Sequence, residues 1–195
     1  MIVLAFDSFK GCMSAADACR AAAKGVLSVD PSADVVCLPL SDGGEGMVEC
    51  ITEALGLKKV SVKVHGPLME EIEVTYALSD DGQTAYMEMA AASGLPLVPP
   101  EKRDPMLTTT FGVGEMLIDA IRRGCKRVVM GIGGSATCDG GEGMILAIKD
   151  YLEKRTEVQK IEVIVASDVD NPLYGEHGAA YIFAPQKDAT PEQVL

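Results

Sequence analysis

The sequence predicts an α/β protein: a Rossmann-like parallel sheet with helices on both faces, plus part of a second, smaller α/β domain. Apolar runs alternate with helical segments at the start of the chain and again after residue 105, the pattern of a parallel sheet. Between these regions, two alternating segments around a tight turn predict an antiparallel hairpin. We therefore assign 1–62 and 105–195 to the first domain, and 63–104 to an antiparallel arm of the second.

The first half of the chain supplies two strand–helix pairs. Residues 2–6 are all apolar, which predicts a strand buried on both faces. Ser14, with Asp17 three residues later, predicts the start of a helix. A second strand is expected over 35–40, and the turn 41–44 leads into a second helix.

The remaining elements form the hairpin and the return of the strand–helix rhythm. Segments 72–78 and 84–89 alternate around a turn and predict two antiparallel strands. Thr110 is expected to cap a helix that Gly124 ends. Two further buried strands are expected over 127–132 and 161–166.

The last residues predict the first turn of a helix, with almost no residues after it to continue the helix. Thr190-Pro191-Glu192-Gln193 combines an N-cap, proline at the first helical position and a capping-box glutamine. The sequence stops at Leu195, so we expect a longer protein to continue there. Missing segments would leave apolar faces uncovered and favour self-association.

Composition excludes several classes of protein. The 195 residues are 48% hydrophobic and 24% charged, which is typical of a folded chain. No apolar run spans a bilayer and no basic leader precedes one, so a cytoplasmic location is expected. The net charge of −12 disfavours nucleic acid and membrane partners. The six cysteines contain no C-x-x-C pair, which disfavours a zinc site.

Four aspartates follow predicted strands: Asp7, Asp42, Asp139 and Asp168. Because the carboxyl ends of parallel strands meet at one edge of a sheet, we expect these carboxylates to converge on a ligand site. Asp42 and Asp139 are the candidates for holding Mg²⁺ or for acting on a hydroxyl group. The alternative is that each aspartate only caps a helix.

A six-residue repeat marks two of these turns, since 42–47 and 139–144 both read Asp-Gly-Gly-Glu-Gly-Met. Adjacent glycines let backbone N–H groups approach an anion, so both turns are candidate phosphate sites. The alternative is two similar turns that need glycine for their backbone angles.

The segment Gly131-Ile132-Gly133-Gly134-Ser135-Ala136 matches the dinucleotide fingerprint G-x-G-x-x-A after a strand. It continues into a second turn instead of opening a helix, so a nicotinamide site remains only a remote alternative. Lys10 is the cation best placed to meet a substrate carboxylate or phosphate, because it follows the first strand directly.

Seven blocks in order along nearly the whole chain resemble the type I glycerate kinase family. They are 6–11 (Phe-Asp-Ser-Phe-Lys-Gly), 41–46 (Ser-Asp-Gly-Gly-Glu-Gly), 87–95 (Met-Glu-Met-Ala-Ala-Ala-Ser-Gly-Leu), 108–115 (Thr-Thr-Thr-Phe-Gly-Val-Gly-Glu), 131–141, 168–173 (Asp-Val-Asp-Asn-Pro-Leu) and 185–187 (Pro-Gln-Lys). The resemblance implies two α/β domains around a cleft, and phosphorylation of D-glycerate to phosphoglycerate with ATP and Mg²⁺.

Together, the residues and the resemblance give the expected site. The catalytic candidates are Asp42, Asp139 and Lys10, and the metal candidates are Asp42 and Asp139. The candidates for binding substrate or phosphate are Asp7, Ser8, Gly43, Gly44, Gly133, Gly134, Ser135, Thr137, Gly140, Gly141, Asp168, Asn171 and Lys187. The alternative function is a truncated, non-catalytic homologue that binds a small anion.

The chain also departs from the family that it resembles. Cys138 stands where the family pattern has Asn, Ser167 where it has Cys, and Asp188 where it has Gly. The segment between Met144 and Ile161 is shorter than the corresponding family segment. We therefore expect this chain, taken alone, to fold in part and to be catalytically silent.

Overall fold

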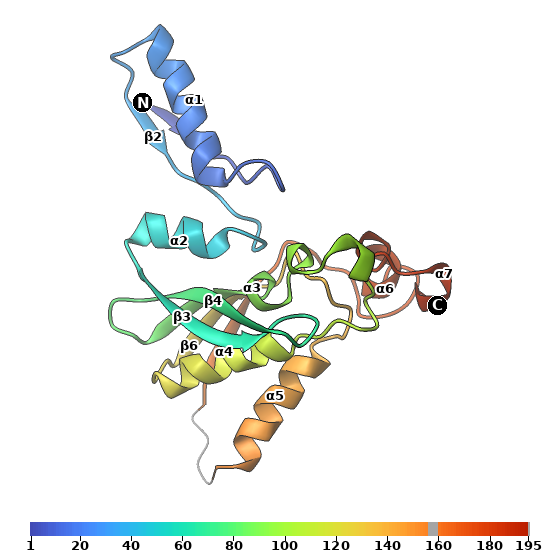
Figure 1. The fold of residues 1–195 in the computed structure, drawn as a ribbon. Coiled ribbons are helices and arrows are strands. Elements are labelled where there is room, and N and C mark those ends of the chain that lie inside the picture. The colour runs from blue at the N-terminus through green and yellow to red at the C-terminus, as the bar shows by residue number, and fades with distance from the viewer. Residues whose placement is uncertain (156–159, 195) are drawn as a thin grey trace.

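A computed structural model describes residues 1–155 and 160–194. Its main feature is a five-stranded sheet in the order β3-β4-β5-β6-β7 (Figure 1). The strands are β3 (Lys58–His65), β4 (Glu71–Leu78), β5 (Thr84–Glu88), β6 (Arg127–Gly131) and β7 (Glu162–Ala166). The first three run antiparallel, and β5, β6 and β7 run parallel to one another.

Helices cover both faces of this sheet. Helix α2 (Met47–Leu55) packs on one face against β4 and β5. Helix α4 (Phe111–Arg122) lies on the other face against β3, with α5 (Glu142–Glu153) packed beside it (Figure 1). Tyr76, Met87 and Met116 are fully buried between the sheet and α4. The predicted α/β class with helices on both faces is confirmed.

The N-terminal unit stands apart from this sheet at one end of the molecule (Figure 1). It consists of β1 (Ile2–Leu4), α1 (Ala15–Val29) and β2 (Val35–Cys37), and β1 and β2 form a separate two-stranded parallel sheet. The prediction that the first strand is buried on both faces was wrong: Ile2 is 42% and Val3 50% exposed. The reason is that β1 has only β2 as a strand neighbour.

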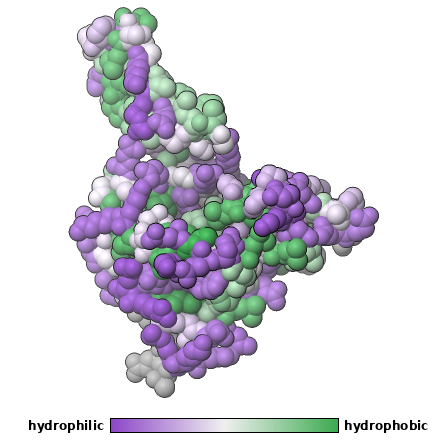
Figure 2. Space-filling model, in the orientation of Figure 1, coloured by the Kyte–Doolittle hydropathy of each residue, from purple (hydrophilic) through white to green (hydrophobic). Residues whose placement is uncertain are grey.

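Apolar side chains are therefore uncovered on this unit, where hydrophobic atoms reach the surface in Figure 2. Phe6, Val36, Leu38 and Leu40 are also more than one third exposed. Strand β7, at the edge of the large sheet, exposes Val163, Ile164 and Val165 in the same way. These faces are what the expected self-association would use, and self-association itself stays a prediction.

The strands do not follow the domain boundaries that we expected from the sequence. The boundary between 62 and 63 falls inside β3, a strand that the sequence analysis did not anticipate. Residues 63–104 do form an antiparallel arm, but β5 pairs in parallel with β6. The arm therefore shares one sheet and one core with residues after 105.

Short helices complete the described chain. They are α3 (Ala90–Ser93), η1 (Leu95–Leu97), η2 (Pro100–Lys102), α6 (Ala179–Phe183), η3 (Pro185–Lys187) and α7 (Pro191–Val194). The predicted capping box of α7 is confirmed, because Thr190 N–H donates to Gln193 Oε1 at 2.8 Å and Gln193 N–H to Thr190 Oγ1 at 3.3 Å. The expected shortening after Met144 includes 156–159, which lie outside the described residues. Among the residues described, no helix has the length and apolarity needed to cross a membrane.

Candidate active site at the ends of the parallel strands

An ion pair joins the N-terminal unit to the loop before α2. Lys10 Nζ lies 2.9 Å from Asp42 Oδ2, with the lysine side chain 64% and the aspartate 30% exposed. The bond to Asp42 raises the pKa of Lys10, and Asp7 and Asp168 add to this effect. The same bond holds the pKa of Asp42 below its usual range. Three of the four predicted aspartates thus act on one ammonium group.

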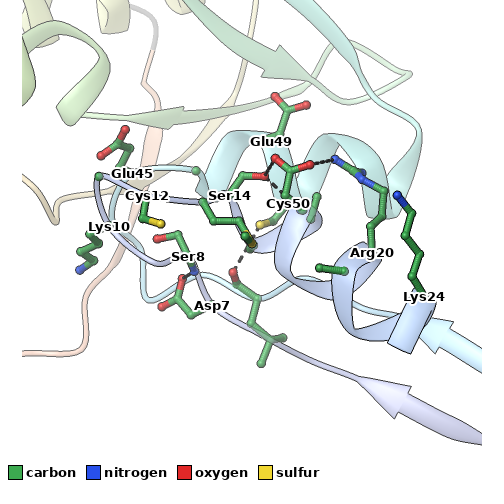
Figure 3. Close-up of a pocket in the computed structure, with 18 residues that line it drawn as sticks. Asp7, Ser8, Lys10, Cys12, Ser14, Arg20, Lys24, Glu45, Glu49 and Cys50 are labelled. Carbon is green, nitrogen blue, oxygen red and sulfur yellow. Dashed lines mark hydrogen bonds and ion pairs between the residues drawn. The ribbon is translucent and has the colours of Figure 1, made fainter. Parts of the chain in front are cut away.

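Two cavities flank this pair. One, of about 690 Å³, lies between the start of α1 and α2 and is lined by Asp7, Ser8 and Lys10 (Figure 3). The other, of about 590 Å³, is lined by Asp42, Gly43 and Asp168 and by apolar side chains of β6 and β7. These six predicted site residues therefore line two neighbouring cavities around the same ion pair.

Glycines let the loop of Asp42 lie directly against the ends of β6 and β7. A Cβ at Gly131 would come 2.2 Å from the carbonyl oxygen of Gly43, and one at Gly133 would come 2.8 Å from Gly44 Cα. Gly133 N–H donates to the Gly43 carbonyl at 3.2 Å. The sequence analysis predicted three of these glycines, Gly43, Gly44 and Gly133, as phosphate-binding residues. In the structure they make a close contact between two loops.

The amide groups of the first repeat are also occupied. Gly44 N–H donates to Asp42 Oδ1 at 2.9 Å, and Gly43 N–H to Ser41 Oγ at 3.3 Å. In the second repeat, Gly141 N–H donates to Asp139 Oδ1 at 3.1 Å. The two repeats therefore share the same aspartate-capped turn, which corresponds to the alternative interpretation of similar turns. An anion would have to replace these carboxylates to use those amides.

Asp139 is the centre of a cap that joins two helices. Its Oδ2 accepts from Thr110 N–H at 2.8 Å, Thr110 Oγ1–H at 2.7 Å and Gly143 N–H at 3.2 Å. Thr110 precedes α4 and Gly141 precedes α5, so one carboxylate fixes both helix starts. No hydrogen bond or ion pair joins Asp139 to Lys10 or Asp42 in the described chain. The expected convergence of four aspartates thus applies to three.

Lys187 is buried, contrary to its expected role in binding substrate. It is 4% exposed, and its Nζ donates to Ser135 Oγ at 2.9 Å and to the carbonyl oxygen of Thr137. The structure therefore brings together three predicted site residues, Lys187, Ser135 and Thr137. The lysine binds the loop from its buried side and does not face solvent. The other two candidates make local contacts: Ser8 N–H donates to Asp7 Oδ1, and Asn171 Nδ2 donates to the His177 carbonyl.

The predicted metal ligands do not form a protein cage for Mg²⁺. Over residues 1–155 and 160–194, no group of three or more His, Cys, Asp or Glu side chains is arranged to hold a metal ion. Both oxygens of Asp139 already accept bonds from protein donors. Asp42 is half-buried, and one of its oxygens is paired with the exposed side chain of Lys10. The geometry does not support a shared site on Asp42 and Asp139.

Comparison with known proteins decides the family. The model of the glycerate kinase family matches residues 2–152 and 146–195. The chain belongs to the glycerate kinase family. Glycerate kinase from Halalkalibacterium halodurans is 45% identical over 97% of this chain and 56% of that protein. Glycerate 2-kinase from Escherichia coli is 39% identical over 100% of this chain and 57% of that protein.

A solved structure agrees with the glycerate kinase assignment. The crystal structure of a protein described as glycerate kinase 2 from Salmonella typhimurium LT2 has a TM-score of 0.78 and 41% sequence identity. The match covers 99% of this chain and 58% of that one. The chain spans about half the length of the curated relatives that it matches.

One departure from the glycerate kinase pattern has a structural meaning. Asp188 adopts φ 63°, a left-handed conformation that glycine takes without steric cost. This is the position where the family pattern has glycine. Asp is among the residues that tolerate this conformation best. The substitution therefore keeps the turn after η3.

The sequence analysis missed Glu88, the residue that fixes the start of α2. Glu88 is 8% exposed, and its carboxylate accepts Gly46 N–H at 3.1 Å and Val48 N–H at 2.6 Å. It thereby satisfies the free amides at the N-terminus of α2, next to the loop of Asp42. An acid at the end of a predicted alternating strand was the available signal, since acidic residues are rarely buried without a partner.

The stability of the protein is expected to depend on pH through Glu88. Burial raises the pKa of Glu88, with Glu45 and Glu49 adding to the effect and the two amides opposing it. The folded state then binds the proton more tightly than the unfolded state. The contribution of Glu88 to the free energy of unfolding is fully present below the unfolded pKa and is lost as pH rises through the folded pKa.

Urea unfolding from pH 4 to 8 of the wild type and of Glu88→Gln measures this contribution as a difference. The other carboxyl groups cancel in that difference, because both proteins contain them. We expect the wild type to lose stability relative to Glu88→Gln as pH rises above the ordinary pKa of a glutamate, because the pKa of Glu88 is raised in the folded state. A difference that is constant over this range would show that Glu88 does not titrate on folding.

Proposed function

We propose that the protein phosphorylates D-glycerate to phosphoglycerate with ATP. Membership of the glycerate kinase family over 2–152 and 146–195 supports this reaction. The observation that carries the proposal is the 2.9 Å pair between Lys10 and Asp42, with Asp7 and Asp168 acting on the same ammonium group. Phosphoryl transfer needs positioned charges more than covalent chemistry from the protein, and this arrangement supplies them.

In this proposal Lys10 binds the carboxylate of glycerate or a phosphate oxygen. Its raised pKa keeps the ammonium charged at neutral pH. Its side chain is 64% exposed, so it can turn from Asp42 to a ligand at little cost. Asp42 then accepts the bond of the attacking hydroxyl group and orients it. The lowered pKa of Asp42 suits an orienting acceptor better than a strong base.

The nucleotide is proposed to lie along the loops at the ends of β6 and β7. Gly134 and Gly140 lie in the loop that follows β6. Mg²⁺, carried by ATP, supplies charge neutralisation on the phosphate oxygens in kinases of this kind. The buried Lys187 is proposed to shape the loop of Ser135 and Thr137 from within.

Two alternatives remain for this chain. The first is a protein that binds a small anion without turning it over. This alternative is compatible with a chain that spans about half the length of its relatives. The second, a nicotinamide oxidoreductase, is disfavoured by the geometry. The fingerprint at 131–136 is followed by helix α5 only at Glu142, and Gly133 N–H is already bonded to Gly43.

Calorimetric titrations of the chain with D-glycerate, with ATP and Mg²⁺, and with NAD test these functions separately. We expect glycerate and ATP to bind and NAD not to bind. Lys10→Ala should weaken glycerate binding about tenfold or more, because a charge-assisted bond contributes roughly 1.5 to 3 kcal/mol.

Lys63→Ala is the matched control, since Lys63 forms a similar exposed pair with Glu71 on β3 and β4. Equal glycerate affinity in the Lys10 and Lys63 variants would remove Lys10 from the site. Binding of glycerate without release of ADP in a coupled assay would favour the non-catalytic alternative, and binding of NAD in place of ATP would overturn the proposal.

A further inference from the structure

A buried amine and an exposed thiol meet behind the glycine-rich loop. Lys187 lies in η3 and Cys138 lies in the loop that follows β6. Lys187 Nζ is 3.6 Å from Cys138 Sγ. The lysine is 4% exposed, whereas Cys138 is exposed to solvent. A small oxidant can therefore reach the sulfur from solvent, and the amine lies next to the sulfur on the buried side.

The surroundings of Lys187 are unusual for a lysine. Its other contacts are Ser135 Oγ and the Thr137 carbonyl, and no carboxylate forms an ion pair with it within the ranges 1–155 and 160–194. Burial lowers the pKa of Lys187, although Cys138 and Asp139 oppose this effect. A lowered pKa favours the deprotonated, nucleophilic form of the amine. The geometry holds this nitrogen 3.6 Å from one sulfur atom.

We propose that Cys138 and Lys187 form a reversible sulfur–nitrogen bond when hydrogen peroxide oxidises the thiol. Peroxide first converts the thiol to a sulfenic acid and is itself reduced to water. The Nζ lone pair then attacks the sulfur, and hydroxide leaves and takes a proton from the nitrogen as a second water. Overall, one thiol, one amine and one peroxide give one sulfenamide and two water molecules. Two equivalents of a small thiol reverse the reaction and restore both side chains.

The bond would tie η3 covalently to the loop at 133–138. That loop is already attached to the middle of the chain, since Ala136 N–H donates to the Ser93 carbonyl and Leu95 N–H to the Gly134 carbonyl. The bond therefore joins three segments far apart in sequence. It would fix a loop that the proposed function places near the nucleotide, but its formation does not depend on that function.

Tryptic mapping of the folded chain after peroxide treatment tests the proposal. Trypsin releases Cys138 in peptide 128–149 and cuts after Lys187 to release 161–187. A sulfenamide blocks this cut, because the modified amine is no longer a lysine for trypsin. We expect 128–149 linked to 161–195, lighter by two hydrogen atoms than the two peptides together. Peptide 161–187 should decrease in proportion and return after dithiothreitol.

Three variants make the result specific. Cys138→Ser and Lys187→Arg should each abolish the linked peptide, and Cys12→Ser, which removes another exposed cysteine, should leave it unchanged. Lys187→Arg changes a buried position and can disturb folding. Cys138→Ser changes an exposed position, so it is the decisive variant. Recovery of 161–187 in full, with Cys138 as a sulfinic acid or in a disulfide, would overturn the proposal.

Discussion

Gly131→Ala is expected to destabilise the protein by roughly 2 to 4 kcal/mol and to displace the loop of Asp42. The added Cβ would lie 2.2 Å from the Gly43 carbonyl oxygen and 3.0 Å from Met47 Sδ. The first of these atoms belongs to backbone, so it cannot rotate away as the end of a side chain would. Either β6 or the loop must move, and the pair of Lys10 and Asp42 moves with the loop.

Urea unfolding and glycerate calorimetry of Gly131→Ala measure the two effects. Gly25→Ala is the matched control, because Gly25 lies inside α1 and an added Cβ there meets nothing within 4 Å. That control should gain roughly 0.5 to 1 kcal/mol from helix propensity. If Gly131→Ala were as stable as the wild type and bound glycerate equally well, the close contact of the two loops would not matter for stability or binding.

Asp139→Ala is expected to cost about 3 to 5 kcal/mol of the free energy of unfolding. The substitution leaves four donors without their acceptor: two on Thr110, one on Gly141 and one on Gly143. These donors belong to the starts of α4 and α5, so both helices lose a cap. Asp139→Asn retains one acceptor oxygen and should cost less.

Denaturant unfolding of Asp139→Ala beside Asp150→Ala separates this network from a surface charge effect. Asp150 lies on α5 in an exposed pair with Lys154, and its loss should change stability by less than about 0.5 kcal/mol. Similar stabilities of the two variants would contradict the cap. That result would favour the catalytic role that the sequence predicted for Asp139.

Local signals in the sequence predicted local structure well. Ser14 caps α1 through Asp17 N–H at 3.1 Å, as the pattern indicated, and Gly56 ends α2 in a left-handed conformation. Six of the seven strands within residues 1–155 and 160–194 overlap an expected segment. Strand β3 was missed although Val60, Val62 and Val64 alternate with polar residues, which is the period of a half-buried strand. Pairing with β4 along its whole length is what makes it a strand.

The candidate site was harder to predict, because its residues depend on partners far away in the sequence. Glu88 bonds to amides about forty positions earlier, and Lys187 bonds to a loop about fifty positions earlier. The aspartates were expected to converge because each follows a strand. Asp139 instead serves a cap, because its carboxylate accepts bonds from Thr110, Gly141 and Gly143, and the contact with Thr110 lies far away in the sequence.

The small sheet of β1 and β2 gives the site a local folding equilibrium of its own. Two short parallel strands and one helix bury little apolar surface, so this unit opens at a lower free energy than the core around Tyr76 and Met116. Lys10 belongs to the unit, and Asp42 sits on the loop beyond it. Each opening separates the two charges, so a ligand held by both must also hold the unit closed. Affinity is then reduced by the fraction of time that the unit is open.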